Sequence, residues 1–309
     1  MNPIICIAGP TASGKTALAV ELAKEFNGEV VSCDSMYVYK RMNIGTAKPT
    51  TEEMDGIVHH MIDVAEPDTD FSVSKYCDMA APIVDDIVAR RKTAIIAGGT
   101  GLYMDSLIKG NDFAPFPATG IREKLEARAA ETGFEAMLEE LRAVDPESAA
   151  RLKDTRRVIR ALEVYYETGI TMTEHNLRTQ SIPPRYKPLW IGLDFTERSE
   201  LYRRIDLRVG IMLEMGLIQE IQDLLSSGIP EKCTAMQAIG YKEFVAALKG
   251  ECTIEEAADQ VRMFSRRYAK RQLTWFRRNK DIHWLIRETG QDSSEILAAA
   301  RQLIRESDK

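Results

Sequence analysis

The chain has 309 residues, of which 44% are hydrophobic and 28% charged, so we expect a globular protein built as one large domain or as a core with an insertion. The sequence predicts no membrane-spanning helix, because no apolar run approaches the roughly 20 residues that a bilayer requires, and we expect no signal peptide. The net charge of −6 does not by itself indicate a nucleic-acid partner, and the five scattered cysteines without a C-x-x-C pair argue against disulfides or zinc and favour a reducing cytoplasm.

The first hundred residues alternate between short apolar strands and helices. The pattern predicts strands at 4–8, 29–33 and 94–97, and helices at 15–26, 72–90 and 101–108. Strands of this kind are typical of a buried parallel sheet, so the predicted fold class is α/β with a doubly wound sheet at its core. Ligands of such sheets bind beyond the carboxyl ends of the strands.

The string GPTASGKT follows the first predicted strand and matches the phosphate-loop pattern G-x-x-x-x-G-K-[ST]. The backbone N–H groups of such a loop, the helix N-terminus and the Lys15 ammonium attract a polyphosphate or diphosphate, and the Thr16 hydroxyl can ligate Mg²⁺. The motif does not say whether the phosphate is transferred, hydrolysed or expelled. The predicted phosphate-binding residues are Gly9, Pro10, Thr11, Ala12, Ser13, Gly14, Lys15 and Thr16.

Two further polar segments follow predicted strands and should meet the phosphate loop at one rim of the sheet. Asp34 could act as a general base or bind a substrate hydroxyl or amine, although aspartate is also common at helix caps and in turns. The string G-G-T-G at 98–101 allows close backbone approach and brings Thr100, which can donate to a phosphate or leaving-group oxygen. The alternative is that these glycines only form a turn before a helix.

Two proline-rich joints, at 112–119 and 181–188, divide the rest of the chain. We therefore expect a core of 1–112 and 189–309 that is interrupted by a helical insertion at 113–188. Helical patterns occupy the insertion at 120–143 and 146–168. The returning chain is predicted to form a strand at 189–195 and helices at 197–226, 234–248, 253–278 and 292–306.

Positive charge is concentrated in two helical segments. Residues 262–280 include eight basic side chains and no acid, and 151–160 has five basic residues against Asp154. A face without acids favours a polyanion, because solvated faces usually alternate in sign. Arg208 belongs to another solvated helix face unless it contacts a phosphate. The basic face at 262–280 is predicted to consist of Arg262, Arg266, Lys270 and Arg277, with Arg267, Arg271 and Arg278 beside it and a core-facing aromatic stripe of Phe264, Tyr268 and Trp275 opposite.

Seven motifs in order along the chain resemble those of bacterial tRNA dimethylallyltransferases, which prenylate the adenine just 3′ of the anticodon. The motifs are GPTASGKT, SCDSMYVYK, MNIGTAKP, GGTGLY, DTRRVIRALE, AIGYKE and AKRQLTWFR. The resemblance covers nearly the whole chain, and the insertion is similar to the one that grips the anticodon arm in this family. Where the family has the motif N-D-P-Q-R, this chain has K-D-T-R-R at 153–157, so the Asn and the Pro are missing.

The resemblance implies a reaction for the rim. The phosphate loop would hold the diphosphate of dimethylallyl diphosphate, and Asp34 would accept a proton from the exocyclic N6 amine of adenine. N6 would attack the allylic C1, and diphosphate would leave. Its developing charge would be stabilised by the catalytic residues Lys15, Thr100 and Arg208, with Mg²⁺ on Thr16.

The resemblance also implies an anticodon stem-loop as partner, with the target base extruded toward Asp34. We expect a cytoplasmic monomer with no membrane partner. The main alternative is an ATP-dependent small-metabolite kinase, which shares the phosphate loop, and a third is a phosphate-loop switch. The predicted tRNA contacts are Asp34, Ser35, Met36, Tyr37, Thr100, Arg122, Arg156, Arg157, Arg160, Gln237, Gly240, Tyr241, Lys242, Arg266, Lys270 and Arg271.

Overall fold

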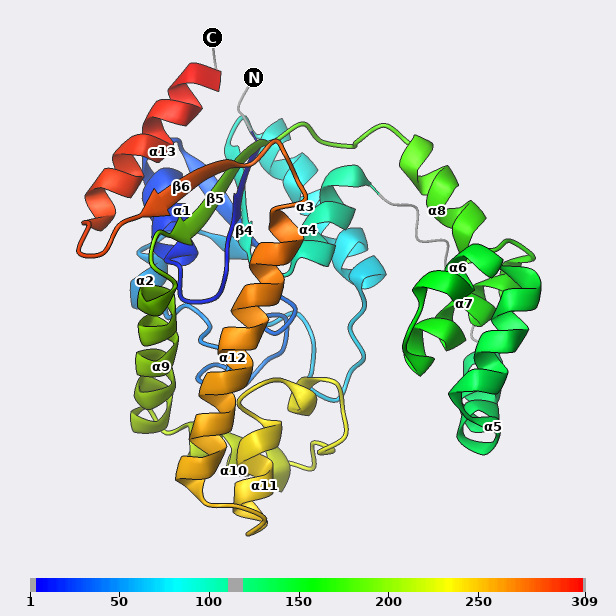
Figure 1. Cartoon of the computed structure of the whole chain (residues 1–309). Helices are drawn as coiled ribbons and strands as arrows, with labels where there is room; N and C mark the ends of the chain where they lie inside the picture. Colours follow the sequence, from blue (N-terminus) through cyan, green and yellow to red (C-terminus); the bar gives the residue numbers. More distant parts are fainter. Residues whose placement is uncertain (1–3, 111–118, 308–309) are drawn as a thin grey trace. The chain divides into compact units, whose positions relative to one another are not determined.

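The computed structural model describes residues 4–110 and 119–307 (Figure 1). The chain divides into two compact units, a core unit of Met1–Ile108 with Tyr186–Lys309 and an insertion unit of Lys109–Arg185. The sequence placed the insertion at 113–188, so both boundaries of the unit come a few residues earlier than expected. The first proline-rich joint, 112–119, lies outside the described residues except for Thr119.

The core unit is built on a parallel sheet of six strands in the order β3-β2-β4-β1-β5-β6. The chain leaves β1 toward β2 on one side and leaves β4 toward β5 on the other, so the two central strands form a topological switch point. The expected doubly wound α/β class is therefore confirmed. The strands are β1 (Ile4–Ala8), β2 (Gly28–Ser32), β3 (His59–His60), β4 (Thr93–Gly98), β5 (Leu189–Phe195) and β6 (His283–Arg287).

The sequence pattern does not predict β3 or β6, which are the two edge strands. β3 has two residues, too few for any periodicity, and β6 is only half-buried or exposed. The four predicted strands are the inner ones. Their nearly continuous burial explains why a plain apolar run was a sufficient signal for them.

Helices flank the sheet, and two of the predicted helical segments are interrupted. Gly216 has φ 95° and ends the first helix of the segment 197–226 before a second begins. Gly240, with φ 99°, lies between a short 3-10 turn and the helix that remains of 234–248. The elements are α1 (Lys15–Glu25), α2 (Thr51–Met54), α3 (Val73–Ala89), α4 (Gly101–Lys109), α9 (Arg198–Glu214), α10 (Leu217–Ser226), η1 (Ala235–Gln237), α11 (Lys242–Leu248), α12 (Ile254–Phe276) and α13 (Ser293–Ser307).

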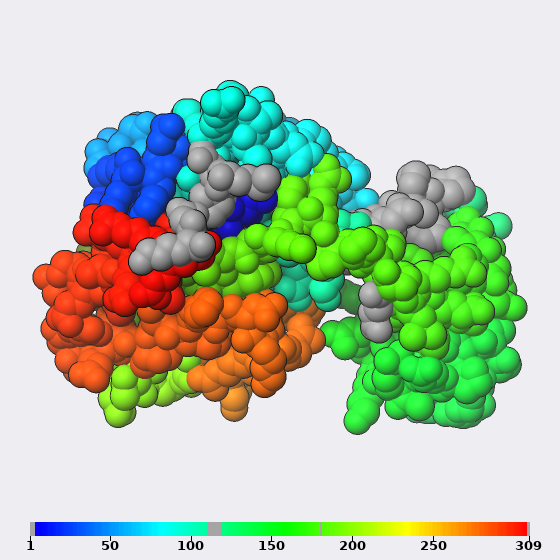
Figure 2. All heavy atoms as spheres, turned by 90° about the horizontal axis from the view of Figure 1, so that it is seen from above, coloured from blue at the N-terminus to red at the C-terminus, as the bar shows by residue number. Residues whose placement is uncertain are grey.

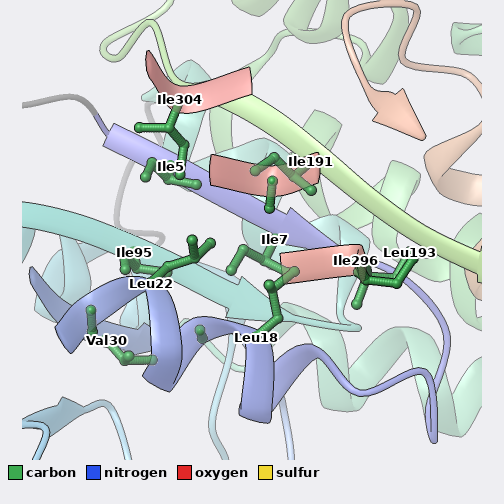
Figure 3. Close-up of a cluster of buried hydrophobic side chains, with 13 residues drawn as sticks. Ile5, Ile7, Leu18, Leu22, Val30, Ile95, Ile191, Leu193, Ile296 and Ile304 are labelled. Atoms are coloured by element: carbon green, nitrogen blue, oxygen red, sulfur yellow. The ribbon is translucent and has the colours of Figure 1, made fainter. Parts of the chain in front are cut away.

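The main hydrophobic core lies between the sheet and helices α1 and α13. Alternate strand residues point into it, because side chains of a strand face opposite sides in turn. Figure 3 shows them meeting the leucines of α1 and the isoleucines of α13. The labelled residues are Ile5, Ile7, Leu18, Leu22, Val30, Ile95, Ile191, Leu193, Ile296 and Ile304. A second cluster joins Phe195 at the end of β5 to α9 and α12.

The C-terminal helix is also held by charge. Arg301 and Arg305 on α13 both pair with Glu25 at the end of α1. Figure 2 shows this red segment lying against the blue N-terminal part of the chain. The last helix therefore covers the face of the sheet that carries α1. Other elements contact the loops at the carboxyl ends of the strands.

The insertion unit is a small helical body with its own core. Leu125, Met137, Leu141, Val158 and Leu162 are buried together in it. Its helices are α5 (Ile121–Val144), α6 (Pro146–Arg151), α7 (Thr155–Thr168) and α8 (Met172–Ser181). The sequence predicts helix over 146–168 but neither its division into α6 and α7 nor α8, because α8 has no apolar stripe and is marked only by the Thr171–Glu174 capping box.

Candidate active site

The loops after β2 and β4 are locked together at the rim of the sheet. The Thr100 N–H donates to Cys33 O at 3.2 Å, and the Ser35 N–H donates to Thr100 Oγ1 at 3.0 Å. A Cβ on Gly98 would lie 2.0 Å from Cys33 O, so only glycine allows this approach. Asp34 is next in the chain to both Cys33 and Ser35, and the structure thus brings it beside Thr100.

The phosphate loop turns from β1 into α1 through glycines that other residues could not replace. Gly14 has φ 92° at the start of α1, and a Cβ on Gly9 would lie 2.8 Å from Leu193 O. The Lys15 ammonium donates to Pro10 O at 2.6 Å, which folds it back over the loop. The hydroxyl of Ser13 is buried and has no hydrogen-bond partner among the described residues. Thr16 follows as the second residue of α1.

The carboxyl group of Asp34 takes part in a turn and also lies near a cation of the phosphate loop. Its Oδ1 accepts the Met36 N–H at 2.8 Å, which is a turn contact. Burial raises the pKa of the Asp34 carboxyl above its usual value, while the Met36 N–H and the nearby Lys15 ammonium oppose that rise. The carboxyl group is therefore within electrostatic reach of the lysine of the phosphate loop.

Two cations converge on this carboxylate from different elements. Burial lowers the pKa of Lys15 from 10.5 to about 7, Asp34 opposes that fall, and the charge of Arg208 adds to it. Arg208 reaches the rim from α9, with Nη1 3.4 Å from Thr11 Oγ1 and Nη2 3.2 Å from Ala47 O. Arg208 is thus a contact of the phosphate loop and does not belong to a solvated helix face.

Tyr37 and Tyr268 are two aromatic side chains that interact with these groups. The Tyr37 hydroxyl donates to Ala47 O at 2.7 Å, and burial raises its pKa to about 12. Burial also raises the pKa of Tyr268 on α12 to about 12, with Asp34 adding to the rise and Thr100 opposing it. Both phenols therefore stay neutral at physiological pH and can act as hydrogen-bond donors.

The sequence-based selection of site residues misses Gln272 and Arg204, which hold the loops in place. Gln272 on α12 accepts the Thr11 N–H at 2.9 Å and donates to Gly99 O at 3.0 Å, so one buried side chain joins the loops after β1 and β4. Arg204 on α9 donates to Ala12 O at 2.9 Å. Gln272 stands in the motif AKRQLTWFR, which was the only signal available for it.

Comparison with known proteins identifies the family of this site. A sequence model described as IPP transferase matches residues 37–279. The tRNA dimethylallyltransferase of Thermoanaerobacter sp. (strain X514) is 47% identical over 297 residues, which cover 95% of this chain and 94% of that protein. The tRNA dimethylallyltransferase of Thermomicrobium roseum is 44% identical, with 100% and 94% covered.

The chain belongs to the IPP transferase family.

Two solved structures of this family share the fold. The full-length tRNA isopentenylpyrophosphate transferase of Bacillus halodurans is 41% identical, with a TM-score of 0.74, and the match covers 100% of this chain and 98% of that one. A eukaryotic dimethylallyltransferase acting on tRNA is 29% identical, with a TM-score of 0.83, and the match covers 99% of this chain and 80% of that one. The resemblance seen in the sequence is confirmed, and the relatives' names support prenyl transfer and not the kinase alternative.

Among the predicted tRNA contacts of this IPP transferase, Tyr241 and Gly240 lie in the interior. Tyr241 is 0% exposed, and its hydroxyl donates to Glu220 at 2.7 Å. The Gly240 N–H donates to the buried carboxylate of Glu243 at 2.8 Å. The ring of Tyr241 packs against Gly45 of the loop 42–48 and leaves no side-chain surface, and a tRNA contact of this residue stays a prediction. The neighbouring Lys242 is exposed.

The arginines of the face predicted on α12 are paired with acidic side chains from outside 262–280. Arg266 pairs with Asp206 of α9 at 2.7 Å, and Arg277 pairs with the buried Asp194 at 2.9 Å. Arg262 pairs with Asp259 and Glu255, one and two turns earlier on α12. A helical wheel places residues on a face but cannot show which acids the fold brings opposite them.

The exposed arginines of α12, and Arg278 just after it, lie over the aromatic stripe. The stripe is half-buried, and its Trp275 indole donates to Asp105 of α4 at 2.9 Å. The guanidinium carbons of Arg267, Arg271 and Arg278 lie 5.9, 5.6 and 3.9 Å from the ring centroids of Phe264, Tyr268 and Trp275. Lys270 is exposed beside them. We call Arg267, Lys270, Arg271 and Arg278 the α12 cation row.

The predicted contacts in the insertion unit lie on its helices. Arg122 and Arg160 share Glu163, at 3.5 and 2.7 Å, and Arg157 pairs with Asp154 at 3.3 Å. Arg156 is exposed. Of the remaining predicted contacts, Gln237 is exposed and its amide donates to Glu231 O at 2.8 Å. Ion pairs at such exposed positions are weak, so these arginines remain able to exchange their partners for phosphates.

Two further findings concern metals and membranes. Within residues 4–110 and 119–307, no three His, Cys, Asp or Glu side chains come together as a metal site. In the same part of the chain, no helix has the length and apolar character to cross a bilayer.

Proposed function

We propose that this chain transfers a dimethylallyl group from dimethylallyl diphosphate to N6 of the adenine immediately 3′ of the anticodon in tRNA, releasing diphosphate. Membership of the IPP transferase family supports the reaction class. The observation that carries the proposal is the hydrogen bonding that joins Ser35, next to Asp34, to Thr100 and brings Arg208 to the phosphate loop of Lys15. It puts a carboxylate and two cations within reach of one substrate.

The two cations suit the leaving group. As N6 forms its bond to C1, the C1–O bond breaks and its electron pair stays on the diphosphate, which gains negative charge. Lys15 and Arg208 would stabilise that charge at the phosphate loop, and Thr100 could donate to the bridging oxygen. Removing one such donor commonly raises the barrier by about 2.7–4 kcal/mol.

Asp34 suits the other half of the reaction. The exocyclic amine is a poor nucleophile, because its lone pair is delocalised into the purine ring, and it must lose a proton as the new bond forms. The Asp34 carboxylate would take that proton. The pKa of Asp34 is raised by burial, which makes it a better proton acceptor than an exposed aspartate, and turnover should fall as the pH falls through this raised value.

The phosphate loop contains a polar group that a bound diphosphate could satisfy. The buried Ser13 hydroxyl has no partner within the described chain, and a bound anion would provide one. Mg²⁺ would be held by the Thr16 hydroxyl together with diphosphate oxygens, and it would neutralise the leaving group. The lack of a carboxylate cluster among the described residues fits this arrangement, because such a protein leaves most of the Mg²⁺ ligands to substrate and water.

The tRNA would be held by charge and shape, and its target base would be extruded into the rim. Ser35, Met36 and Tyr37 follow Asp34 and are half-buried, which suits contacts to an extruded nucleotide. The α12 cation row offers guanidinium groups near Thr100 and Asp34, since Arg271 stacks on Tyr268. The insertion arginines would contact the same RNA. A cytoplasmic location and a monomeric state stay predictions.

The test is an incubation with Mg²⁺ and a tRNA that has adenine 3′ of the anticodon, with either labelled dimethylallyl diphosphate or γ-labelled ATP. We expect prenyl label in the RNA and no phosphoryl transfer. Label passing from ATP to a small acceptor, with inert tRNA, would refute the proposal.

A second arm tests the carboxylate itself. Asp34→Asn should keep tRNA affinity and lower kcat by about 10²–10⁴-fold, the usual contribution of a general base. Asp55→Asn is the matched control, because Asp55 is exposed and forms an ion pair with the surface residue Lys24. Turnover of Asp34→Asn near that of the control would remove Asp34 as the base.

A further inference from the structure

The carboxylate of Glu220 gathers four donors from two segments far apart in the sequence. Its Oε2 accepts the N–H groups of Asn43 and Ile44, both at 2.8 Å. Its Oε1 accepts the Gly45 N–H at 3.1 Å and the Tyr241 hydroxyl at 2.7 Å. Three successive N–H groups that point at one anion form a concave nest, and here the anion is a side chain of α10.

Other contacts fix the same loop, residues 42–48. A Cβ on Gly45 would lie 2.6 Å from the ring of Tyr241, so the loop backbone packs directly on that ring. At the far end, the buried Lys48 ammonium donates to Tyr39 O at 2.7 Å, Asn43 Oδ1 at 2.9 Å and Asp63 Oδ1 at 2.5 Å. The loop is thus held at both ends, and Ala47 lies between them.

Ala47 connects this loop to the catalytic groups. Its carbonyl accepts the Tyr37 hydroxyl at 2.7 Å and Arg208 Nη2 at 3.2 Å. The other terminal nitrogen of Arg208, Nη1, lies 3.4 Å from Thr11 Oγ1 in the phosphate loop. The place of the Ala47 carbonyl therefore helps to set the direction in which Arg208 points.

We propose that Glu220 is a positioning residue for the reaction, which acts by fixing the loop 42–48 so that the Ala47 carbonyl aims Arg208 and Tyr37 at the rim. Glu220 itself does not touch substrate. This inference rests on the proposed function for its effect on turnover, but its effect on diphosphate binding can be measured without it.

The chemistry of the nest requires a carboxylate. In Glu220→Gln the side chain keeps its shape, but one oxygen becomes an NH₂ group. If the NH₂ takes the place of Oε2, it meets the N–H groups of Asn43 and Ile44; if it takes the place of Oε1, it meets the Gly45 N–H and the Tyr241 hydroxyl. In the first orientation two N–H groups lose their acceptor. In the second the Gly45 N–H loses its acceptor, whereas the Tyr241 hydroxyl can turn and accept from the NH₂, so the loop should shift in either case.

The experiment is a double-mutant cycle of Glu220→Gln and Arg208→Ala, measured as kcat, as KM for dimethylallyl diphosphate, and as Kd for inorganic diphosphate by calorimetry. We expect Glu220→Gln alone to lower kcat by about 10- to 100-fold, the effect of a misplaced catalytic group. In the Arg208→Ala background the same change should have little further effect. Asp223→Asn, an exposed carboxylate on the same helix, is the control and should behave as wild type.

A merely structural role predicts a different result. It would lower the unfolding midpoint of Glu220→Gln while its effects on kcat and on diphosphate Kd add fully to those of Arg208→Ala, and that additivity would overturn the proposal. Unchanged kinetics of Glu220→Gln would overturn it as well. If Glu220→Gln does not fold, Tyr241→Phe takes its place in the cycle, because it removes one donor and keeps the ring against Gly45. If wild type transfers no prenyl group, the proposed function fails, and the cycle in diphosphate Kd still decides this inference.

Discussion

The amide of Gln272 should be a strong determinant of both stability and diphosphate binding, because its two hydrogen bonds join the loops that follow the paired strands β1 and β4. Gln272→Leu would leave the Thr11 N–H and the buried Gly99 carbonyl without their partners. An unpaired buried polar group costs about 1–3 kcal/mol. Because water can reach the half-buried Thr11, we expect the free energy of unfolding to fall by about 2–4 kcal/mol in total.

Gln272→Glu separates the two bonds. The carboxylate still accepts the Thr11 N–H, but it cannot donate to Gly99 O, so it should destabilise less at the phosphate loop and more at the loop after β4. Unfolding by denaturant and calorimetric titration with inorganic diphosphate measure the two consequences. Thr274→Ala is the control on the same helix, since Thr274 is exposed and its hydroxyl donates to Lys270 O of its own helix.

The expected order of diphosphate affinity is control, then Gln272→Glu, then Gln272→Leu, with about a tenfold or greater loss for Leu from misplacement of the phosphate loop. If Gln272→Leu unfolds at the same denaturant concentration as the control and binds diphosphate equally well, the bridge does not organise the site, and the reasoning is refuted.

Two other predictions concern charge. Because the pKa of Lys15 is lowered to about 7 in the unliganded protein and a bound anion should raise it again, diphosphate affinity should be full below pH 7 and weaken as the pH rises above it. Calorimetry from pH 6 to 9 measures this, with Lys15→Arg correcting for ionisation of the ligand; the same slope in both proteins would contradict it. Replacing Arg267, Lys270 and Arg271 of the α12 cation row by Gln should weaken tRNA binding and reduce its salt slope by about 0.7–0.9 for each phosphate that the row no longer neutralises. An unchanged slope in filter binding, with Arg262→Gln as control, would mean that the row does not meet the RNA backbone.

Features that depend on adjacent residues could be predicted from the sequence. The phosphate loop is one contiguous string, and its glycines, lysine and threonine act through the backbone that they share. The inner strands follow from short apolar runs, and the rule that ligands bind at the carboxyl ends of parallel strands brought Asp34 and Thr100 to the same rim. The glycines at 216 and 240 could have indicated the two helix breaks, but the longer helical pattern around them predicted unbroken helices.

Partners chosen over long separations could not be predicted. Thr11 and Gln272 are 261 positions apart, and Thr11 and Arg208 are 197 apart, so no pattern in the chain relates them. The helical periodicity of α12 could not show the ion-pair partners of its basic residues, because Asp206 and Asp194 come from α9 and β5. Tyr241, which its motif predicts to be a tRNA contact, is buried and packs against the loop 42–48.

By itself, then, the sequence determined what the rim of this sheet can bind, because backbone geometry and the chemistry of neighbouring residues are written within a few positions of each other. Only the tertiary structure decided which side chains hold that rim in shape. Gln272 and Arg204 reach it from α12 and α9, and Glu220 on α10 holds the loop 42–48. A hydrogen bond between distant segments exists only where the packing of the whole core unit puts donor and acceptor within about 3 Å of each other.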